Sequence, residues 1–312
     1  MATTRRPTMT DVARRANVSQ ATVSYIVNNV PTQSISQETR AAVEKAIAEL
    51  GYTRNAQARS LASGTSGVVV CVIPPLPLAE PVLRLLGALT AEFAARGFTM
   101  TVHFERSGDA TYQAMVDALK PEVVFSLFPA DLPEGSVALG ASDIPDAGCH
   151  LQVEYLVSRG HTRLAFAGSS ENELGKQSGA RARQVAERAR TLGLPEVVSG
   201  PIASDPLESA RQVAQWHRQG VTAICANNDE VAVALLRAIR DAGLACPEDL
   251  SVIGYDASAV GSLSLPPLTS IAWDAERAAP TIADLVLGVP TAMATANLLE
   301  VRLVERESVA TR

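Results

Sequence analysis

Short apolar runs alternate with longer stretches of helical period over most of the chain. From residue 67 onward the runs GVVVCVIP, FTMTVHF, EVVFSLF, RLAFAG, VTAICA and LSVIGY have the length of buried strands. The helix-period stretches between them are 82–96, 109–119, 147–159, 178–192, 207–219 and 228–243. This alternation predicts an α/β fold of doubly wound parallel sheets. The strands are too many for one compact sheet, so we expect two lobes with a cleft. A helix after Trp273 and a strand over 297–305 would form the return crossing between the lobes.

The first 53 residues have the pattern of a small three-helix bundle. Over 10–29 we expect two short helices joined by a tight turn at Asn17, a residue that tolerates positive φ. Thr10 and Ser19 are candidate N-caps of these helices. The inward residues of the second helix are Val23, Ile26 and Val27. A third helix is expected from about residue 37 to residue 50, with Gly51 at its C-terminal end. Its expected apolar stripe is Ala42, Val43, Ala46, Ile47 and Leu50.

The outer face of the second helix carries side chains that suit the major groove of DNA. Gln20 can form two hydrogen bonds with adenine, Ala21 can contact a thymine methyl group, and Tyr25 can reach a base or a phosphate. The alternative is the solvated face of an ordinary three-helix bundle, because short pairs of helices recur in many proteins.

Charge divides the chain in the same place as the hydrophobic pattern. The 312 residues are 47% hydrophobic and 19% charged, as in a globular protein, with a net charge of −6. Residues 1–66 hold eight basic and four acidic side chains, a net charge of +4, which leaves −10 for residues 67–312. The first segment is therefore the one expected to meet a polyanion, although chance clustering would give the same asymmetry.

Other features exclude several classes of protein. No run approaches the roughly 20 apolar residues of a membrane span, and the N-terminal segment lacks the apolar stretch of a secretory signal, so we expect a cytoplasmic protein with no membrane partner. The four cysteines are dispersed and are expected to be buried, reduced thiols rather than a disulfide set. They are Cys71, Cys149, Cys225 and Cys246.

The sequence nominates no catalytic residue, metal site or cofactor. It contains no phosphate-binding glycine loop, zinc-protease motif or nucleophile elbow. The histidines are dispersed, and His161 at a turn before a strand is expected to be structural. We expect Trp216 and Trp273 to lie in the core or in a cleft wall.

The connector NAQARSLASG, residues 55–64, holds one large apolar residue, Leu61, among small and polar ones. It is too short for a stable isolated helix, which needs roughly 12 residues or more. One interpretation is a plain linker whose leucine packs on the core. The other is a helix that forms only on DNA, where an apolar wedge in the minor groove unstacks a base step.

Three N-terminal segments together resemble the LacI/GalR family of bacterial transcriptional repressors. They are MTDVARRANVSQATVSYIVNN (9–29), ISQETRAAVEKAIAELGY (35–52) and NAQARSLASGTSGVVV (55–70). The resemblance implies that Gln20, Ala21 and Tyr25 read bases, that Asn55 opens a hinge helix, and that Leu61 is its wedge. It also implies a set of residues at or near phosphates: Thr10, Ser19, Thr22, Asn28, Ser36, Thr39 and Tyr52.

Two departures from the family pattern lie next to these motifs. The connection between Asn28 and Ile35 is slightly long. Arg54 stands where the family commonly has a proline, which removes a rigid helix start but adds a candidate phosphate contact.

The large C-terminal segment resembles the core of the same family, a fold shared with periplasmic sugar-binding proteins. The matching segments are 155–168, 223–256 and 266–271. The resemblance implies a homodimer whose interlobe cleft binds a small effector, such as a sugar or another metabolite, with Arg183, Asn228 and Asp256 at cleft positions. Arginine and aspartate can fork hydrogen bonds onto vicinal hydroxyl groups. The alternatives are that Asn228 only caps a helix and that Arg183 is a solvated charge.

Around this pocket the chain departs from the family. The loop PPLPLAEP, residues 74–81, has almost nothing that could bond a sugar, and the segment from 128 to 146 is shorter than usual. After Arg183 the chain has Ala186 and Glu187 where the family often has a glycine and an aromatic residue. We therefore expect the first-lobe half of the pocket to be apolar or reduced, and the effector to differ from an ordinary pyranose.

These observations predict three parts. Residues 1–53 form a helix-turn-helix DNA-binding domain, 54–66 a hinge, and 67–312 a core. The first lobe of that core is expected over about 67–160 and 274–290, and the second over about 161–273 and 291–312. The resemblance implies a regulator, a repressor, that binds a palindromic operator of double-stranded DNA as a homodimer. The alternative is a cytoplasmic solute-binding or enzymatic α/β protein with a helical interaction module.

Overall fold

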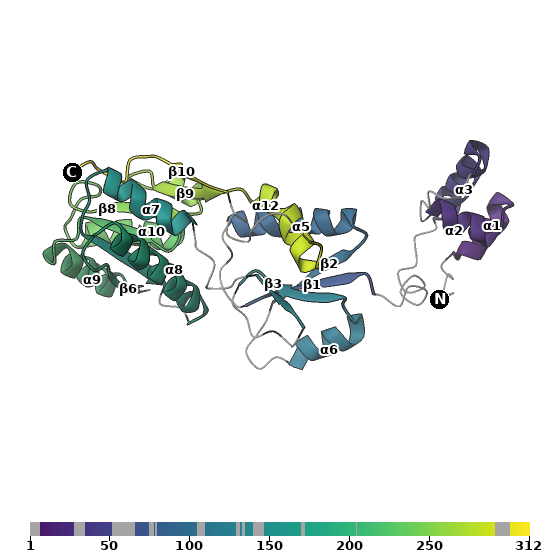
Figure 1. Ribbon diagram of the computed structural model, residues 1–312, viewed down its shortest axis with the longest axis horizontal. Helices are drawn as coiled ribbons and strands as arrows, with labels where there is room; N and C mark the ends of the chain where they lie inside the picture. The colour runs from purple at the N-terminus through teal and green to yellow at the C-terminus, as the bar shows by residue number, and fades with distance from the viewer. Residues whose placement is uncertain are drawn as a thin grey trace. The chain divides into compact units, whose positions relative to one another are not determined.

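The chain folds into two units, residues 1–66 and residues 67–312, which are described separately (Figure 1). The computed structural model describes residues 7–27, 35–51, 66–74, 78, 80–104, 110–128, 132, 135–139, 147–169, 172–203, 205–290 and 300–312.

The first unit contains the predicted helices α1 (Met9–Ala16), α2 (Gln20–Val27) and α3 (Gln37–Leu50). The N-cap of α1 is Thr8, and the prediction of Thr10 was wrong. The Thr8 hydroxyl accepts a hydrogen bond from the backbone of Asp11, and the Asp11 carboxylate accepts one from the Thr8 backbone at 2.9 Å. This reciprocal arrangement needs a spacing of three residues, which Thr10 does not have. Asn17 ends α1 in the left-handed conformation with φ 54°, as expected.

The core of the first unit joins all three helices. Its fully buried members are Val12, Ala13, Val23, Ile26, Val27, Val43 and Ala46. Ile47 and Leu50 pack against this core, whereas Ala42 is exposed, so the predicted stripe of α3 was one residue too wide. Gly51 follows α3 at φ 60°, where a residue without Cβ meets no strain.

Two sheets form the second unit. Within the described residues, the first sheet has the order β2-β1-β3-β4 and the second the order β10-β9-β8-β7-β5-β6. All described strand pairs are parallel except β10 with β9, as expected for a doubly wound fold with a return strand. The strands are β1 (Val68–Ile73), β2 (Thr99–Phe104), β3 (Val123–Ser126), β4 (Val137–Ala138), β5 (Leu164–Ser169), β6 (Val198–Ile202), β7 (Ala223–Ala226), β8 (Ser251–Tyr255), β9 (Thr269–Trp273) and β10 (Val301–Val304).

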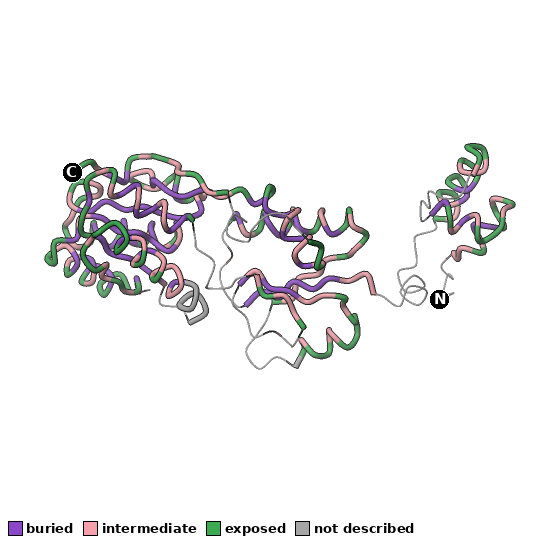
Figure 2. The backbone as a smooth tube through the Cα atoms, in the orientation of Figure 1, coloured by how far each residue is buried: buried purple, intermediate pink, exposed green. Residues whose placement is uncertain are grey.

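Helices cover the faces of these sheets and bury the apolar strands between them (Figure 2). The helices of this unit are α5 (Glu80–Ala95), α6 (Ala110–Leu119), α7 (Ala147–Ser158), α8 (Asn172–Thr191), α9 (Pro206–Arg218), α10 (Asp229–Asp241), α11 (Ala259–Ser262) and α12 (Ala275–Val286). In the first lobe, α5 and α12 pack together on β1 and β3. In the second lobe, α9 and α10 cover one face of the sheet, while α7 and α8 contribute to a separate core with β5, β8 and β9.

The position of α7 corrects the predicted lobe boundary at about residue 160. Cys149, Val153 and Leu156 of α7 are buried in the second-lobe core with Leu164 and Phe166. The second lobe therefore already includes residue 147, because an apolar helix face belongs to the sheet against which it is buried.

Several single-residue expectations are confirmed. Cys71, Cys149 and Cys225 are buried and all four cysteines are free thiols, as expected, whereas Cys246 is half-buried instead of buried. His161 is fully buried, with Nδ1 2.9 Å from the Thr222 hydroxyl and Nε2 3.1 Å from the carbonyl oxygen of Ala310. Burial lowers the pKa of this imidazole, as expected for a structural histidine.

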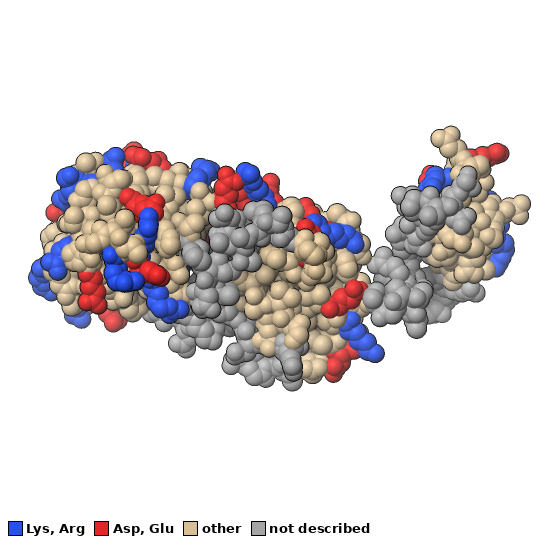
Figure 3. Space-filling view, viewed as in Figure 1, with Lys and Arg blue, Asp and Glu red and all other residues tan. Residues whose placement is uncertain are grey.

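The charges of the second unit are mixed on the face that Figure 3 shows. Acidic and basic side chains lie interspersed there. Within the described residues, no helix is long and apolar enough to cross a membrane.

Candidate functional site

The outer face of α2 is accessible, as the helical period predicted. Gln20 and Ala21 are exposed, and Tyr25 is 37% exposed. The opposite face of the helix is held in the core through Val23 and Ile26. The helix therefore presents an amide, a methyl group and a phenol on one accessible surface.

Hydroxyl groups lie at the N-terminal ends of α2 and α3. The Ser19 hydroxyl accepts a hydrogen bond from the Thr22 backbone at 3.0 Å, and the Ser36 hydroxyl accepts one from the Thr39 backbone at 3.2 Å. Both serines are exposed, as is Thr10 in the first turn of α1. Helix N-termini that display hydroxyls and free N–H groups are suited to phosphate.

Part of the predicted DNA-binding set lies outside the described residues. This applies to Asn28, Tyr52, Asn55 and Leu61, and also to Arg54.

In the second unit, Asp256 directly follows β8 and has an unusual backbone. Its φ is 108°, and that of Ala257 is 46°, a region that side-chain-bearing residues rarely adopt. Two hydrogen bonds hold this turn on β9: the Asp256 backbone donates to the Ile271 carbonyl at 2.7 Å, and the Ala257 backbone donates to the Ser270 hydroxyl at 3.0 Å. Backbone strain of this kind clusters at binding sites, where it orients a side chain.

The Asp256 carboxylate is buried beside an indole. Its Oδ1 accepts a hydrogen bond from Trp273 Nε1 at 3.1 Å. Burial raises the pKa of Asp256 to about 6, although the nearby charge of Arg181 and the Trp273 hydrogen bond act in the opposite direction. Such a carboxyl group can gain or lose a proton near neutral pH when a ligand approaches.

The arginine whose charge acts on Asp256 is Arg181, whereas Arg183 was the predicted one. The Arg181 guanidinium carbon lies 3.8 Å from the centre of the Tyr255 ring, and its Nη1 donates to the Asn227 carbonyl. Residues two apart on a helix point about 200° apart, so Arg183 leaves α8 in a different direction. Arg183 is exposed and has no hydrogen bond or ion pair with a described residue. Its effector role stays a prediction.

Asn228 is the N-cap of α10, the alternative that the sequence had left open. Its Oδ1 accepts a hydrogen bond from the Val231 backbone at 2.9 Å. No described residue accepts from its Nδ2, so capping leaves the amide donor available to a ligand.

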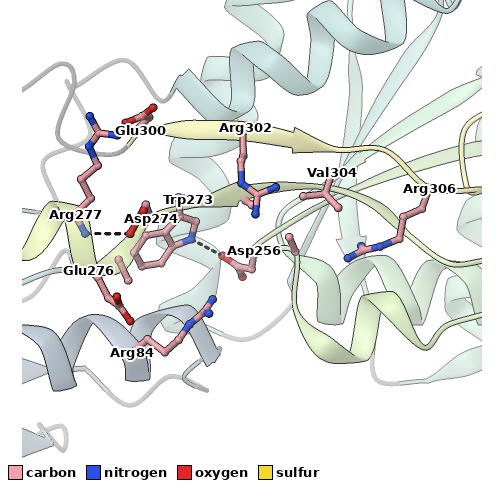
Figure 4. Close-up of a pocket in the computed structure, with 13 residues that line it drawn as sticks. Arg84, Asp256, Trp273, Asp274, Glu276, Arg277, Glu300, Arg302, Val304 and Arg306 are labelled. Atoms are coloured by element: carbon pink, nitrogen blue, oxygen red, sulfur yellow. Dashed lines mark hydrogen bonds and ion pairs between the residues drawn. The ribbon is translucent and has the colours of Figure 1, made fainter.

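A pocket of about 470 Å³ opens beside Asp256 and Trp273 (Figure 4). One wall consists of Arg84 on α5 and the first turn of α12, and the other consists of residues on β9 and β10, including Arg302 and Val304. The pocket therefore lies between the two lobes. Neither Arg183 nor Asn228 lines it.

Comparisons with known proteins agree over the whole chain. Residues 8–55 match the model of bacterial regulatory proteins of the lacI family, and residues 153–309 match the periplasmic binding protein-like domain. The lactose operon repressor of Escherichia coli (strain K12) is 30% identical, over 96% of this chain and 90% of that protein. The chain belongs to the lacI family of bacterial regulatory proteins.

A second curated relative and two solved structures support the same assignment. The regulator CelR of Thermobifida fusca is 29% identical, over 97% of this chain and 98% of its own length. The lac repressor dimer bound to operator and the anti-inducer ONPF is 25% identical with a TM-score of 0.74, over 98% of this chain and 100% of that one. A CelR–cellobiose complex is 25% identical with a TM-score of 0.58, over 97% of this chain and 100% of that one.

As a lacI-family protein the chain is a DNA-binding transcriptional regulator, and the relatives named above are regulators rather than enzymes. The sequence had missed Arg181 and the pocket arginines of this regulator. Arg181 is two residues from the predicted Arg183, and only the rotation of α8 decides which one faces Tyr255. Arg84 and Arg302 belong to no motif, and they line one pocket only because α5 and β10 come together.

Proposed function

We propose that this lacI-family regulator is a repressor that binds a palindromic operator as a homodimer and responds to a small effector between its lobes. The observation that carries the proposal is the accessible face of α2 on a chain that matches a DNA-bound lac repressor dimer from end to end. Two-fold symmetry of the protein requires two half-sites related by the same symmetry.

The DNA-binding roles follow the exposed surface. Gln20, Ala21 and Tyr25 enter the major groove and read bases, while hydroxyls at the N-termini of α2 and α3 bind phosphates. Asn55 and Leu61 form the hinge helix and its minor-groove wedge. The proposed phosphate contacts are Thr10, Ser19, Thr22, Asn28, Ser36, Thr39 and Tyr52.

An exposed apolar surface next to α11 supports the homodimer. Leu263 is 82% exposed and Leu265 is 89% exposed, and Val260 nearby is 48% exposed. Large apolar side chains gathered in this way mark contact surfaces between proteins. A second copy of the chain would bury the same residues from the other side of a two-fold axis.

The effector acts through the angle between the lobes. The proposed cleft residues are Arg183, Asn228 and Asp256, of which Asp256 lines the pocket beside the crossing strands. A ligand with different affinities for two lobe arrangements shifts their populations, and thereby the spacing of the two DNA-binding domains in a dimer. Either release by an inducer or tightening by a corepressor follows from the same mechanism.

Selection of operators from a random pool of double-stranded DNA tests the proposal. We expect the full chain to enrich a palindrome, and failure to enrich one would contradict the function. Gln20→Ala should relax base preference at one position of each half-site, at a cost of about 1–3 kcal/mol. Gln215→Ala on α9 is the matched control, because it removes the same side chain from an exposed helix position outside the DNA-binding domain.

The hinge is tested separately by Leu61→Ser. If Leu61 is a wedge, this variant weakens binding to the selected palindrome far more than binding to unrelated DNA. Equal losses for the two DNAs would instead indicate a plain linker.

A further inference from the structure

The pocket between the lobes contains four arginines from three different parts of the fold. They are Arg84 on α5, Arg277 on α12, and Arg302 and Arg306 on or directly after β10. Figure 4 shows the guanidinium groups of Arg84, Arg302 and Arg306 directed into the pocket, around Trp273 and Asp256. Whether these arginines are available to a ligand depends on which of them are already paired with an acidic side chain.

Most of the acidic groups in the pocket are engaged. Glu300 forms an ion pair with Arg277 at 2.6 Å, and Asp274 caps α12 by accepting from the Arg277 backbone at 3.0 Å. Asp256 accepts from the Trp273 indole. Glu276 is the remaining acid of the lining, and it is exposed.

Three of the four arginines form no ion pair with a described residue, and two of these form no hydrogen bond either. Arg84 and Arg302 form no ion pair or hydrogen bond with any described residue, and both are exposed. The Arg306 guanidinium donates to the carbonyl oxygen of Leu268, a neutral partner that leaves its charge in place. After the Arg277–Glu300 pair, the lining holds three arginines and three acids, so its charges are equal in number. Arg84 on the first lobe and Arg302 on the second are the two arginines whose N–H donors all remain available to a ligand.

We propose that the effector of this regulator is an anionic small molecule whose phosphate or carboxylate group bridges Arg84 of the first lobe and Arg302 of the second. The inference rests on the proposed function and names the ligand class of its cleft. Guanidinium groups present paired N–H donors that match the oxygens of these anions. A neutral hexose would leave both charges unneutralised.

Such a bridge also explains how ligand binding changes the lobe angle. Arg84 moves with α5 and the first-lobe core, whereas Arg302 moves with the second-lobe sheet. An anion held by both is bound most tightly when the two walls approach, so it favours one arrangement over the other. Asp256 in the same pocket has a raised pKa, so it gives up its negative charge beside an anion more readily than an ordinary carboxyl group.

The test is titration calorimetry on the full chain with three probes: a hexose 6-phosphate, the same unphosphorylated hexose, and citrate. We expect at least one anion to bind more tightly than the neutral sugar, and the phosphate and citrate arms separate the two anion types. Arg84→Gln and Arg302→Gln should each weaken that binding about tenfold or more, and Arg302→Lys should keep part of it. Arg211→Gln, an exposed arginine on α9 outside the pocket, should bind like the original chain.

Three results would overturn the inference: binding of the neutral hexose as tightly as its phosphate, no binding of either anion, or unchanged anion binding in both glutamine variants. Operator selection with the same preparation distinguishes this failure from failure of the proposed function. A chain that enriches a palindrome but ignores the anions remains a regulator with a different effector class.

Discussion

Two buried carboxylates at neighbouring strand ends of the second lobe have opposite surroundings. Asp229, in the first turn of α10, accepts hydrogen bonds from the backbone and hydroxyl of Ser258 at 2.6 and 2.8 Å and from the Ser270 hydroxyl at 2.5 Å. Asp256, after β8, accepts only from Trp273 among the described residues and lines a pocket. Burial raises the pKa of both.

The difference separates a structural carboxylate from one that is available to a ligand. The Asp229 side chain fills the space beside Gly254 and Gly261, where a Cβ atom on either glycine would collide with it. The hydrogen bonds and close contacts of Asp229 hold β8, β9 and α11 together. The Asp256 region instead has a strained backbone, an open pocket and a carboxylate oxygen that accepts no hydrogen bond from a described residue. Burial alone therefore does not identify a site; unsatisfied bonding capacity next to a cavity does.

The largest expected change in stability comes from removing the Asp229 carboxylate. Asp229→Ala removes the acceptor of three hydrogen bonds and leaves Ser258 and Ser270 groups buried without partners. We expect the free energy of unfolding of the core to fall by about 3 kcal/mol, measured by urea unfolding. Glu230→Ala, an exposed acid one residue further along the same helix, should change it by less than about 0.5 kcal/mol. Similar losses in the two variants would contradict the distinction.

The next largest effect is an increase in stability, and it is expected at Asp256. The folded pKa of Asp256 is about 6 against an ordinary 3.8, so the folded chain binds this proton more tightly than the unfolded chain. Its contribution to stability is complete below pH 3.8 and is lost as the pH rises through about 6. Asp256→Asn, which keeps the shape and tolerates positive φ, should therefore stabilise the core by about 2 kcal/mol above pH 7.

The pH dependence of that variant provides its own control. The stability gain should shrink as urea unfolding is repeated toward pH 4, where the carboxyl group is protonated in the folded state and partly protonated in the unfolded state. A gain that is the same at pH 7.5 and pH 4.5, or a loss at pH 7.5, would show that Asp256 is a structural ion like those in ordinary salt bridges.

The smallest effect is expected at Asn228, the residue that precedes Asp229 and caps α10. Asn228→Ala removes the N-cap of α10 and should cost about 1 kcal/mol of unfolding free energy, whereas Asn228→Ser keeps a capping hydroxyl and most of the stability. Because serine lacks the amide donor, calorimetry with hexose 6-phosphate separates the two roles. Weaker binding in the stable serine variant supports the effector role, and unchanged binding reduces Asn228 to a cap.

Hydrophobic period and turn residues were sufficient to predict most elements of the fold. The apolar runs before residue 128 became β1, β2 and β3, and the later ones became β5, β7 and β8. Three strands had no such signal. β4 has two residues, β6 contains Gly200 and Pro201, and β9 begins with Thr269 and Ser270, which are buried although polar. Thr269 and Ser270 form hydrogen bonds with residues distant in the sequence, and a local pattern cannot reveal such partners.

The site was predictable only in part. The resemblance to the family core placed Asp256 at the cleft, and its position directly after an apolar run agrees with this, because binding residues lie at the strand ends of parallel sheets. The cap at Thr8 instead of Thr10 is a local feature, because its hydrogen bonds to Asp11 span only three residues. The choice between Arg181 and Arg183 and the lobe to which α7 belongs depend on packing. A sequence window holds both candidates in each case, and tertiary contacts select one.

The sequence by itself determined the alternation of strands and helices, the accessible face of α2, and the lacI-family motifs, because these depend on residue spacing within one element. Only the tertiary structure decided which polar groups are satisfied. Ser258 and Ser270 reach Asp229 across 29 and 41 residues of chain, whereas Arg84 and Arg302 meet at one pocket without a partner among the described residues. Hydrogen bonds and charge pairs form between elements that the fold brings together, so the available charges become visible only after the chain has folded.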